Sequence, residues 1–192
     1  IRGNISEIKT LASLCGTQGK NSGNMEVSDT MDVGKITDKS DHCGKITGID
    51  GSGRGVDADN ADTVTEENLA QHISNAKMLS KKLQTIVAIT GAIDLVTDGS
   101  SCYVIRNGNP QMGHVTGAGC QLSGILTAFL AANPENKLQA AAAAVCMMGY
   151  AGELAAEKSG QSGSGTYRVS LMDAVSCMDG DILERGARYE IR

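Results

Sequence analysis

The chain is poor in aromatic residues and has no tryptophan. Its 192 residues include one Phe and four Tyr, although 41% of the residues are hydrophobic. A packed core must therefore be aliphatic and rich in alanine. The length and composition suit one globular domain, or part of a larger one.

The sequence also lacks any run of Lys and Arg. It carries 17 basic and 22 acidic residues, a formal net charge of −5. Proteins that bind nucleic acid normally carry a basic patch or stripe. The charge pattern therefore argues against a nucleic-acid partner.

Neither a CxxC pair nor a signal-peptide pattern occurs in the chain. The six cysteines are widely spaced, so we interpret them as reduced thiols of a cytoplasmic protein without a zinc site. The longest nearly uncharged stretch, 140–152, is too short and too alanine-rich for a membrane span, which needs about 20 apolar residues. We expect it to be a buried helix and expect no membrane partner.

An initiator methionine is also missing, and Ile1 is typical of the last residue of a strand. This start predicts that the chain begins inside a domain. Residues 15–62, by contrast, are rich in Gly and Asp and poor in apolar residues. We expect a long insertion there, loosely structured in places, that is either functional or a linker.

The rest of the chain alternates between helical and strand patterns. Apolar periodicity and capping signals predict helices over 4–14, 63–83, 118–132 and 134–159, and a last helical segment over 169–178. Short apolar runs predict strands over 85–90, 94–98 and 102–107, with a turn at 107–110 and a flexible loop at 159–165. Strands that alternate with helices indicate an α/β domain with a largely parallel sheet.

A glycine-rich turn, TGAGC (116–120), leads into the helix expected over 118–132. Gly117 and Gly119 permit the backbone conformation and close approach that an anion-binding turn needs. The N–H groups from Gly117 to Cys120, with Ala118 between the glycines, would converge at a helix N-terminus, where the dipole favours negative charge. An ordinary tight turn into a helix explains the same glycines equally well.

Cys120 stands where this turn becomes a helix. A helix N-terminus favours the thiolate form of cysteine, so Cys120 is a candidate acceptor for the proton of an alcohol held above the turn. The alternative is a small buried hydrophobic residue, and we assign that role to the other cysteines outside the insertion, Cys102, Cys146 and Cys177.

Two further segments carry candidate site residues. Asn4 and Glu7 form a capping box for the first helix, and Arg2 just before them is placed to face the same anion as the glycine turn. Thr90 ends a predicted strand, and the carboxyl ends of parallel strands are where open α/β sheets bind ligands. Taken alone, a helix cap and a strand–turn explain these two segments.

In combination and in this order, the segments resemble the hydroxyethylthiazole kinase family, which is ribokinase-like. The resemblance rests on IRGNISEI (1–8), RGVDA (54–58), VAITGAIDLVTDG (87–99), VTGAGCQLSGILTAF (115–129) and GSGTYRVSLMDAV (163–175). It implies a ribokinase-like fold, with this chain as the C-terminal portion of one kinase domain. The family pattern begins well before Ile1.

The resemblance also implies a function and roles for the candidate residues. The reaction is ATP-dependent phosphorylation of a thiazole alcohol in thiamine biosynthesis, with Mg²⁺ as a further cofactor. Arg2 and Thr90 would contact ATP, Gly117 would line the alcohol, and Asn4 and Glu7 would help to organise Mg²⁺ through water. Catalysis would fall to Cys120, Gly119 and Ala118. The family also forms homotrimers.

Two alternatives remain open from the residues. One is a related kinase of hydroxymethylpyrimidine or pyridoxal, whose glycine turn can also end in cysteine. The other is a nucleotide-binding fragment that lacks turnover.

Overall fold

The sheet at the centre of the fold contains five strands in the order β1-β2-β3-β4-β5. The computed structural model describes residues 1–14 and 64–192, so the predicted insertion at 15–62 lies outside the described residues. The strands are β1 (Arg2–Gly3), β2 (Val87–Ile89), β3 (Asp94–Thr97), β4 (Cys102–Ile105) and β5 (Tyr189–Ile191).

Our expectation of a largely parallel sheet is wrong for the described part of the chain. β1 and β2 are parallel, with Gly3 opposite Ile89, but the pairs β2–β3, β3–β4 and β4–β5 are antiparallel. For β2–β3 and β3–β4 the reason is the length of the connections. Residues 90–93 and 98–101 are too few for the crossover that a parallel pair needs, and they close tight hairpins instead. The sheet is therefore mixed, within an α/β fold.

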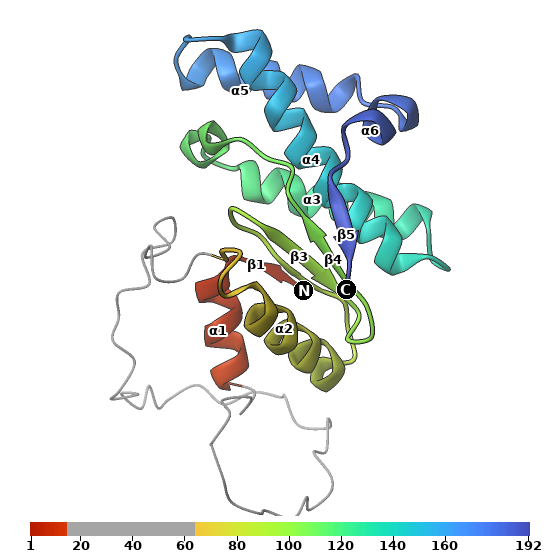
Figure 1. Ribbon diagram of the computed structural model, residues 1–192. Helices are drawn as coiled ribbons and strands as arrows, with labels where there is room; N and C mark the ends of the chain where they lie inside the picture. Colours follow the sequence, from red (N-terminus) through yellow and green to blue (C-terminus); the bar gives the residue numbers. More distant parts are fainter. Residues whose placement is uncertain (15–63) are drawn as a thin grey trace, which may run out of the picture. The chain divides into compact units, whose positions relative to one another are not determined.

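Helices cover both faces of the sheet (Figure 1). On one side, α1 (Ile5–Leu14) contacts β1, and α2 (Leu69–Leu83) packs on β2 and β3. On the other side, α4 (Lys137–Ser159) packs on β3 and β4, with α3 (Ala118–Ala132) and α5 (Ser164–Ser176) against it.

Alternation along the strands divides the core into two layers. Val87 and Ile89 of β2 belong to the layer under α1 and α2, while Ala88 between them belongs to the layer under α3 and α4. The same alternation separates Leu95 from Val96 in β3. Because both faces of β2, β3 and β4 are buried, these three strands are largely apolar runs in the sequence.

The helix α4 is the central helix of the second layer and is rich in alanine. It is the one helix among the described residues that is long and apolar enough to cross a membrane, but 72% of its most apolar window is buried inside the fold. The stretch 140–152 is therefore a buried core helix, as predicted. Gly149 and Gly152 on α4 let the loop after β4 approach closely, because a β-carbon at Gly149 would lie 2.7 Å from the Asn107 carbonyl oxygen.

Several predicted boundaries need correction. The helix α4 begins at Lys137 after an Asn136 cap, not at Pro134, although Gly160 ends it as expected. The helix α2 begins at Leu69, later than the predicted residue 63, which lies outside the described residues.

The predicted last helical segment, 169–178, corresponds to α5, which starts earlier, at Ser164, inside the segment that we expected to be a flexible loop. Three other elements were not predicted. The short helix η2 (Pro110–His114), the helix α6 (Gly180–Gly186) and β5 carry weak sequence signals because each is short.

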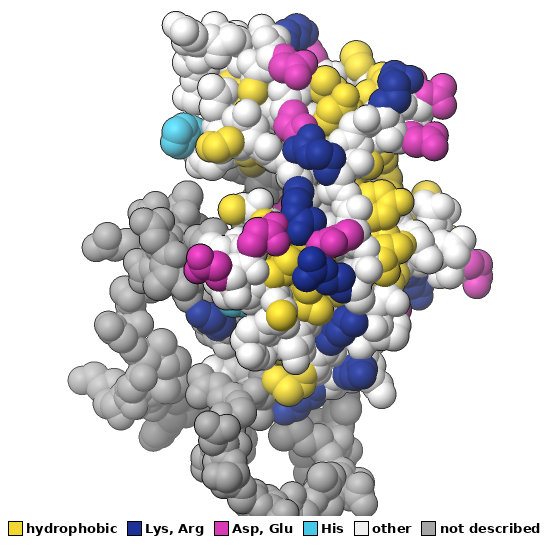
Figure 2. All heavy atoms as spheres, in the orientation of Figure 1, with side chains coloured by type: hydrophobic (Ala, Val, Ile, Leu, Met, Phe, Trp, Pro, Cys, Tyr) yellow, Lys and Arg dark blue, Asp and Glu magenta, His cyan; other side chains and the backbone are white. Residues whose placement is uncertain are grey.

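Charged side chains of both signs are intermixed on the face shown in Figure 2. A chain of ion pairs lies at the β5 edge. Arg106 contacts Glu66 at 3.0 Å and Glu190 at 2.9 Å, and Glu190 contacts Arg192 at 2.8 Å. These half-exposed pairs tie β5 to β4 and to the segment before α2.

Candidate active site

The glycine turn forms the amino end of α3. Gly117 is the N-cap residue with φ of +90°, a left-handed conformation that favours glycine, and no side chain caps the helix. The Ala118 N–H donates to the Val115 carbonyl oxygen at 3.2 Å, so it is used inside the turn. Among the described residues, no acceptor receives the N–H groups of Gly119 and Cys120. This helix end therefore presents unpaired donors to an anion.

Arg2 lies directly against this helix end. A β-carbon placed on Gly119 would come within 2.8 Å of Arg2 Nη2 and 3.1 Å of Nη1. A β-carbon at position 119 would therefore push the guanidinium away from its present place against α3. The positive charge of Arg2 and the unpaired N–H groups therefore lie together at the amino end of α3.

Thr90 holds Arg2 from the other side. Arg2 Nη2 donates to Thr90 Oγ1 at 3.3 Å, and the parallel pairing of β1 and β2 brings the Thr90 N–H to the Gly3 carbonyl oxygen at 3.0 Å. The Nε atom of Arg2 is buried and has no hydrogen-bond partner in the described part of the chain. Thus Arg2, Thr90 and Gly119 lie together at the carboxyl end of the parallel pair of β1 and β2, and Arg2 lies at the glycine turn as the sequence predicted.

Asn4 and Glu7 form the predicted capping box. The Asn4 N–H donates to Glu7 Oε2 at 2.7 Å, and the Glu7 N–H donates to Asn4 Oδ1 at 2.9 Å. No group of three or more His, Cys, Asp or Glu side chains able to hold a metal occurs among the described residues. The cap occupies Oε2 and leaves Oε1 of an exposed carboxylate for a water-mediated contact, so this pair fits an indirect role toward Mg²⁺ and not a complete ligand set.

Cys120 is an exposed, free thiol in the first turn of α3. Its exposure excludes the alternative of a buried packing residue. Cys102 and Cys146 are buried, as we expected, but Cys177 is exposed, so its predicted core role is wrong. Cys177 follows the last residue of α5, where the chain leaves the packed surface.

Sequence reasoning missed Asp94, the first residue of β3. Its Oδ1 atom accepts the Gly91 N–H at 2.7 Å and so closes the turn that follows Thr90. Burial raises the pKa of Asp94 to about 7, against the lowering effect of the Gly91 hydrogen bond and the Arg2 charge. The sequence pattern TGAID (90–94) could have identified Asp94, because an Asp three residues after a Gly suggests a side chain that accepts a hydrogen bond from the nearby backbone.

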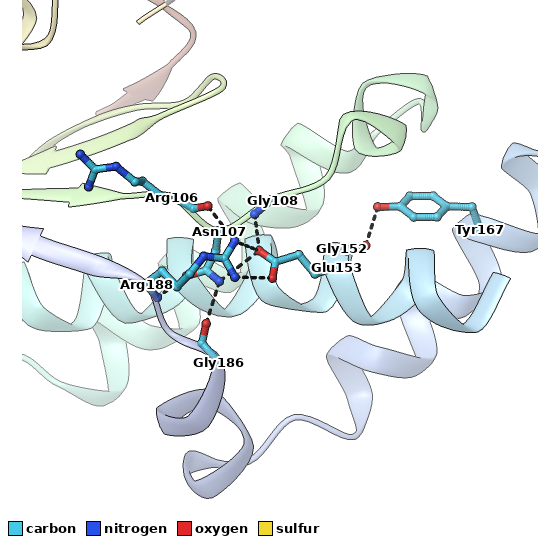
Figure 3. Close-up of polar contacts among 8 residues, drawn as sticks. All are labelled: Arg106, Asn107, Gly108, Gly152, Glu153, Tyr167, Gly186 and Arg188. Carbon is cyan, nitrogen blue, oxygen red and sulfur yellow. Dashed lines mark hydrogen bonds and ion pairs between the residues drawn. The ribbon is translucent and has the colours of Figure 1, made fainter. Parts of the chain in front are cut away.

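A second missed group anchors the chain that leads to the glycine turn (Figure 3). Glu153 Oε1 on α4 accepts the Gly108 N–H at 2.7 Å and Asn107 Nδ2 at 3.1 Å. Arg188 donates to both carboxylate oxygens of Glu153 at 2.7 Å. Buried Asn107 also donates to the Gly186 carbonyl oxygen at 2.9 Å. Sequence analysis predicted only a turn here, because the partners lie far along the chain.

Next along the chain, η2 packs on the same helix. A β-carbon on Gly152 would collide with Met112 Sδ, and the hydroxyl of buried Tyr167 donates to the Gly152 carbonyl oxygen at 3.0 Å (Figure 3). The segment from Asn107 to Met112 is thereby fixed on α4 before it reaches Gly117.

A cleft of about 670 Å³ lies on the other flank of Arg2. It is lined by Ile1, Leu126 and Gln84 among others, and it extends toward the start of β2 and not toward Thr90 or Gly117. The cleft therefore shares Arg2 with the site but none of the glycine turn.

The fold and the site define a class. An α/β protein that presents an uncapped helix N-terminus, an arginine and a strand-end hydroxyl at one point has the elements of a phosphate-binding site. The sequence comparison then gives the family. The chain belongs to the hydroxyethylthiazole kinase family, whose model matches residues 17–181.

Individual relatives agree with this assignment. The chain is 40% identical over 191 residues to the hydroxyethylthiazole kinase of Clostridium acetobutylicum, and the match covers 99% of the chain and 57% of that relative. It is 33% identical over 194 residues to hydroxyethylthiazole kinase 2 of Methanosphaera stadtmanae, with 100% of the chain and 58% of the relative covered. The chain thus spans less than two thirds of the length of these relatives.

A solved structure shows the same fold. The hydroxyethylthiazole kinase protein of Pyrococcus horikoshii matches with a TM-score of 0.59 and 28% identity, over 66% of this chain and 48% of that chain.

Proposed function

We propose that this protein transfers the γ-phosphoryl group of ATP to the hydroxyl of 4-methyl-5-(2-hydroxyethyl)thiazole, in thiamine biosynthesis or salvage. Membership of the hydroxyethylthiazole kinase family supports the substrate and the use of ATP. The contact between Arg2 and the amino end of α3 at Gly119 carries the proposal on the structural side. A kinase needs concentrated positive potential where the phosphoryl group moves, and this contact supplies it.

Each residue at the site has a role in this proposal. Arg2 donates to phosphate oxygens of ATP, and Thr90 fixes the arginine and contacts the nucleotide. The N–H groups of Gly119 and Cys120 stabilise the negative charge on the phosphoryl group during its transfer. Ala118 shapes the turn, because its own N–H is used by Val115.

The alcohol binds beside Gly117, and Cys120 in its thiolate form takes the proton of the alcohol and becomes the neutral thiol. Phosphoryl transfer proceeds through a loose transition state, in which proton removal is late and a weak base suffices. A cysteine that is exposed at the helix end satisfies that requirement.

Magnesium, when bound, neutralises negative charge on the phosphates of ATP. We assign Glu7 Oε1 and the Asn4 side chain to water molecules of that ion, because the cap uses Glu7 Oε2. The cap keeps both side chains at the end of β1, next to Arg2.

The test is production of ADP and of the phosphorylated alcohol with three acceptors: the thiazole alcohol, hydroxymethylpyrimidine and pyridoxal. We expect turnover with the thiazole alcohol and at least tenfold lower kcat/KM with the other two. A higher kcat/KM with hydroxymethylpyrimidine or pyridoxal would show that this alcohol, and not the thiazole alcohol, is the substrate. ATP binding by calorimetry without any ADP production would reassign the chain as a nucleotide-binding protein.

We also propose that the protein is a homotrimer with the thiazole site between subunits, as the family resemblance implies. Light scattering coupled to size-exclusion chromatography measures the mass in solution. A monomer that is fully active would contradict a shared site.

A further inference from the structure

Asp94 occupies a position in the site that the proposed chemistry does not use. It begins β3, opposite Ile105 of β4, and its Oδ1 accepts the Gly91 N–H at 2.7 Å. Gly91 directly follows Thr90, whose hydroxyl receives Arg2 Nη2 at 3.3 Å. One carboxylate therefore closes the turn that carries the anchor of the arginine.

The hydrogen bond to Thr90 alone does not account for the position of the Arg2 side chain. Arg2 makes one side-chain hydrogen bond among the described residues, to Thr90, and its buried Nε atom has none. Its terminal nitrogens lie against Gly119, where the helix end also presents positive potential. A guanidinium next to a helix N-terminus is repelled by it, so a negative charge nearby favours this position of the side chain.

We propose that Asp94 is a positioning residue for Arg2. Its carboxylate fixes the Thr90–Gly91 turn and supplies the counter-charge that keeps the guanidinium over the amino end of α3. The ligand class is that of the site itself, a phosphate-bearing nucleotide. The kinetic part of this inference rests on the proposed phosphoryl transfer, whereas the coupling between Asp94 and Arg2 does not.

The ionisation of Asp94 has few competing influences. Arg2 on β1 acts on it with positive charge, and the Cys146 thiol on α4 is the other titratable group coupled to it. Burial raises the pKa of Cys146 to about 12, with a smaller contribution from Asp94, so that thiol stays neutral near pH 7. Burial also lowers the pKa of the Ile1 amino group, next to Arg2 in the chain, from 8.0, so the Asp94→Asn variant is what assigns a titration near pH 7 to Asp94.

Three proteins test the inference: wild type, Asp94→Asn and, as a matched control, Asp98→Asn. Asn at position 94 retains an oxygen that can accept the Gly91 N–H but carries no charge. Asp98 lies four residues further on, where it accepts the N–H groups of Ser100 and Ser101 in the β3–β4 turn. The control thus makes the same chemical change at the opposite end of β3.

The first readout is nuclear magnetic resonance of the Arg2 Nε–H group from pH 5.5 to 8.5, without any nucleotide. We expect its signal to shift with a midpoint near pH 7 in wild type and in Asp98→Asn, and to stay constant in Asp94→Asn. A signal that is independent of pH in wild type, or that still titrates in Asp94→Asn, overturns the inference. This result stands even if the protein has no kinase activity.

The second readout is steady-state kinetics. Asp94→Asn should lower kcat/KM for ATP about tenfold, mainly through a higher KM, because Arg2 is then held less well for the phosphates. A general loss of folded protein would instead lower the measured kcat in proportion to the circular-dichroism signal, which the comparison with Asp98→Asn monitors. A wild-type kcat/KM for ATP in Asp94→Asn would overturn the positioning role while leaving the proposed function intact.

Discussion

Gly119 and Arg2 are in direct contact: a β-carbon on the glycine would lie 2.8 Å from Nη2 of the arginine. The two residues come from the first strand and from a helix more than a hundred positions later. Their contact is the point at which the strand-end residues and the glycine turn become one site. It also gives a steric test of that site.

Gly119→Ala should displace the Arg2 guanidinium without unfolding the protein. The added methyl group enters space that Nη1 and Nη2 occupy, and misplacement of a site group by about 1 Å typically costs about 10²-fold in rate. Gly124→Ala is the matched control on the same helix, because a β-carbon there meets nothing within 4 Å. Equal kcat/KM for the two variants would show that the contact has no part in catalysis.

Arg2→Ala should raise the KM for ATP more than the KM for the alcohol. A hydrogen bond to a charged group contributes about 1.5–3 kcal/mol, which corresponds to roughly 10- to 150-fold in KM. Arg2→Lys retains the charge but not the fork geometry, so it should recover only part of the loss. ATP dependence that is unchanged in Arg2→Ala would remove this residue from the nucleotide site.

Substitutions of Cys120 separate a proton acceptor from a bystander. If the thiol takes the proton of the alcohol, Cys120→Ala should lower kcat by about 10² to 10⁴ with substrate binding retained. Cys120→Asp should retain substantial activity, because a carboxylate can take the same proton. The opposite order, with Cys120→Ala more active than Cys120→Asp at saturating substrates, would rule out Cys120 as the proton acceptor.

Glu153→Gln should destabilise the fold and leave the chemistry largely intact. The Glu153 carboxylate, whose side chain is 17% exposed, is bound by Arg188, Gly108 and Asn107. The loss of its charge should lower the free energy of unfolding by about 1.5–3 kcal/mol in urea titrations. Asp173→Asn breaks the exposed pair with Lys158 and is the control that should leave that free energy unchanged within error. Equal stability of the two variants would contradict an anchoring role.

The same carboxylate predicts a dependence of stability on pH. Burial acts to raise the pKa of Glu153, but hydrogen bonds from Arg188, Gly108 and Asn107 outweigh it and hold the pKa below its usual 4.5. A depressed pKa contributes stability that is present above about pH 4.5 and is lost as the pH falls through the lower folded-state value. The difference in unfolding free energy between wild type and Glu153→Gln should therefore shrink below that pH. A difference that grows on acidification would show that the ionised carboxylate destabilises the fold.

The local parts of the fold could be predicted from the sequence. The capping box of Asn4 and Glu7 and the bounds of α3 depend on neighbouring residues, and both were predicted correctly. The sheet direction was not, because buried antiparallel hairpins and buried parallel strands have the same apolar pattern. Strand β5 was missed since its pairing with β4 joins residues more than eighty positions apart.

In the candidate site, too, some residues could be predicted from the sequence and others could not. Arg2 was expected to face the same anion as the glycine turn, and the pairing of β1 with β2 is the contact that brings it to Thr90. Glu153 was missed because its carboxylate acts through partners that only the folded chain supplies, whereas Asp94 was missed although its partner Gly91 is only three residues away. A charged residue within an apolar run gives no sign of which group it will face.

The account rests on one claim, that the amino end of α3 beneath Arg2 receives the transferred phosphoryl group. A crystal structure of the protein with the thiazole alcohol and a non-hydrolysable ATP analogue tests it most directly. We expect the terminal phosphate within hydrogen-bond distance of the Gly119 and Cys120 N–H groups, with Arg2 on the phosphates and the alcohol beside Cys120. Phosphates bound instead in the cleft lined by Ile1, Gln84 and Leu126, with the glycine turn empty, would contradict the account.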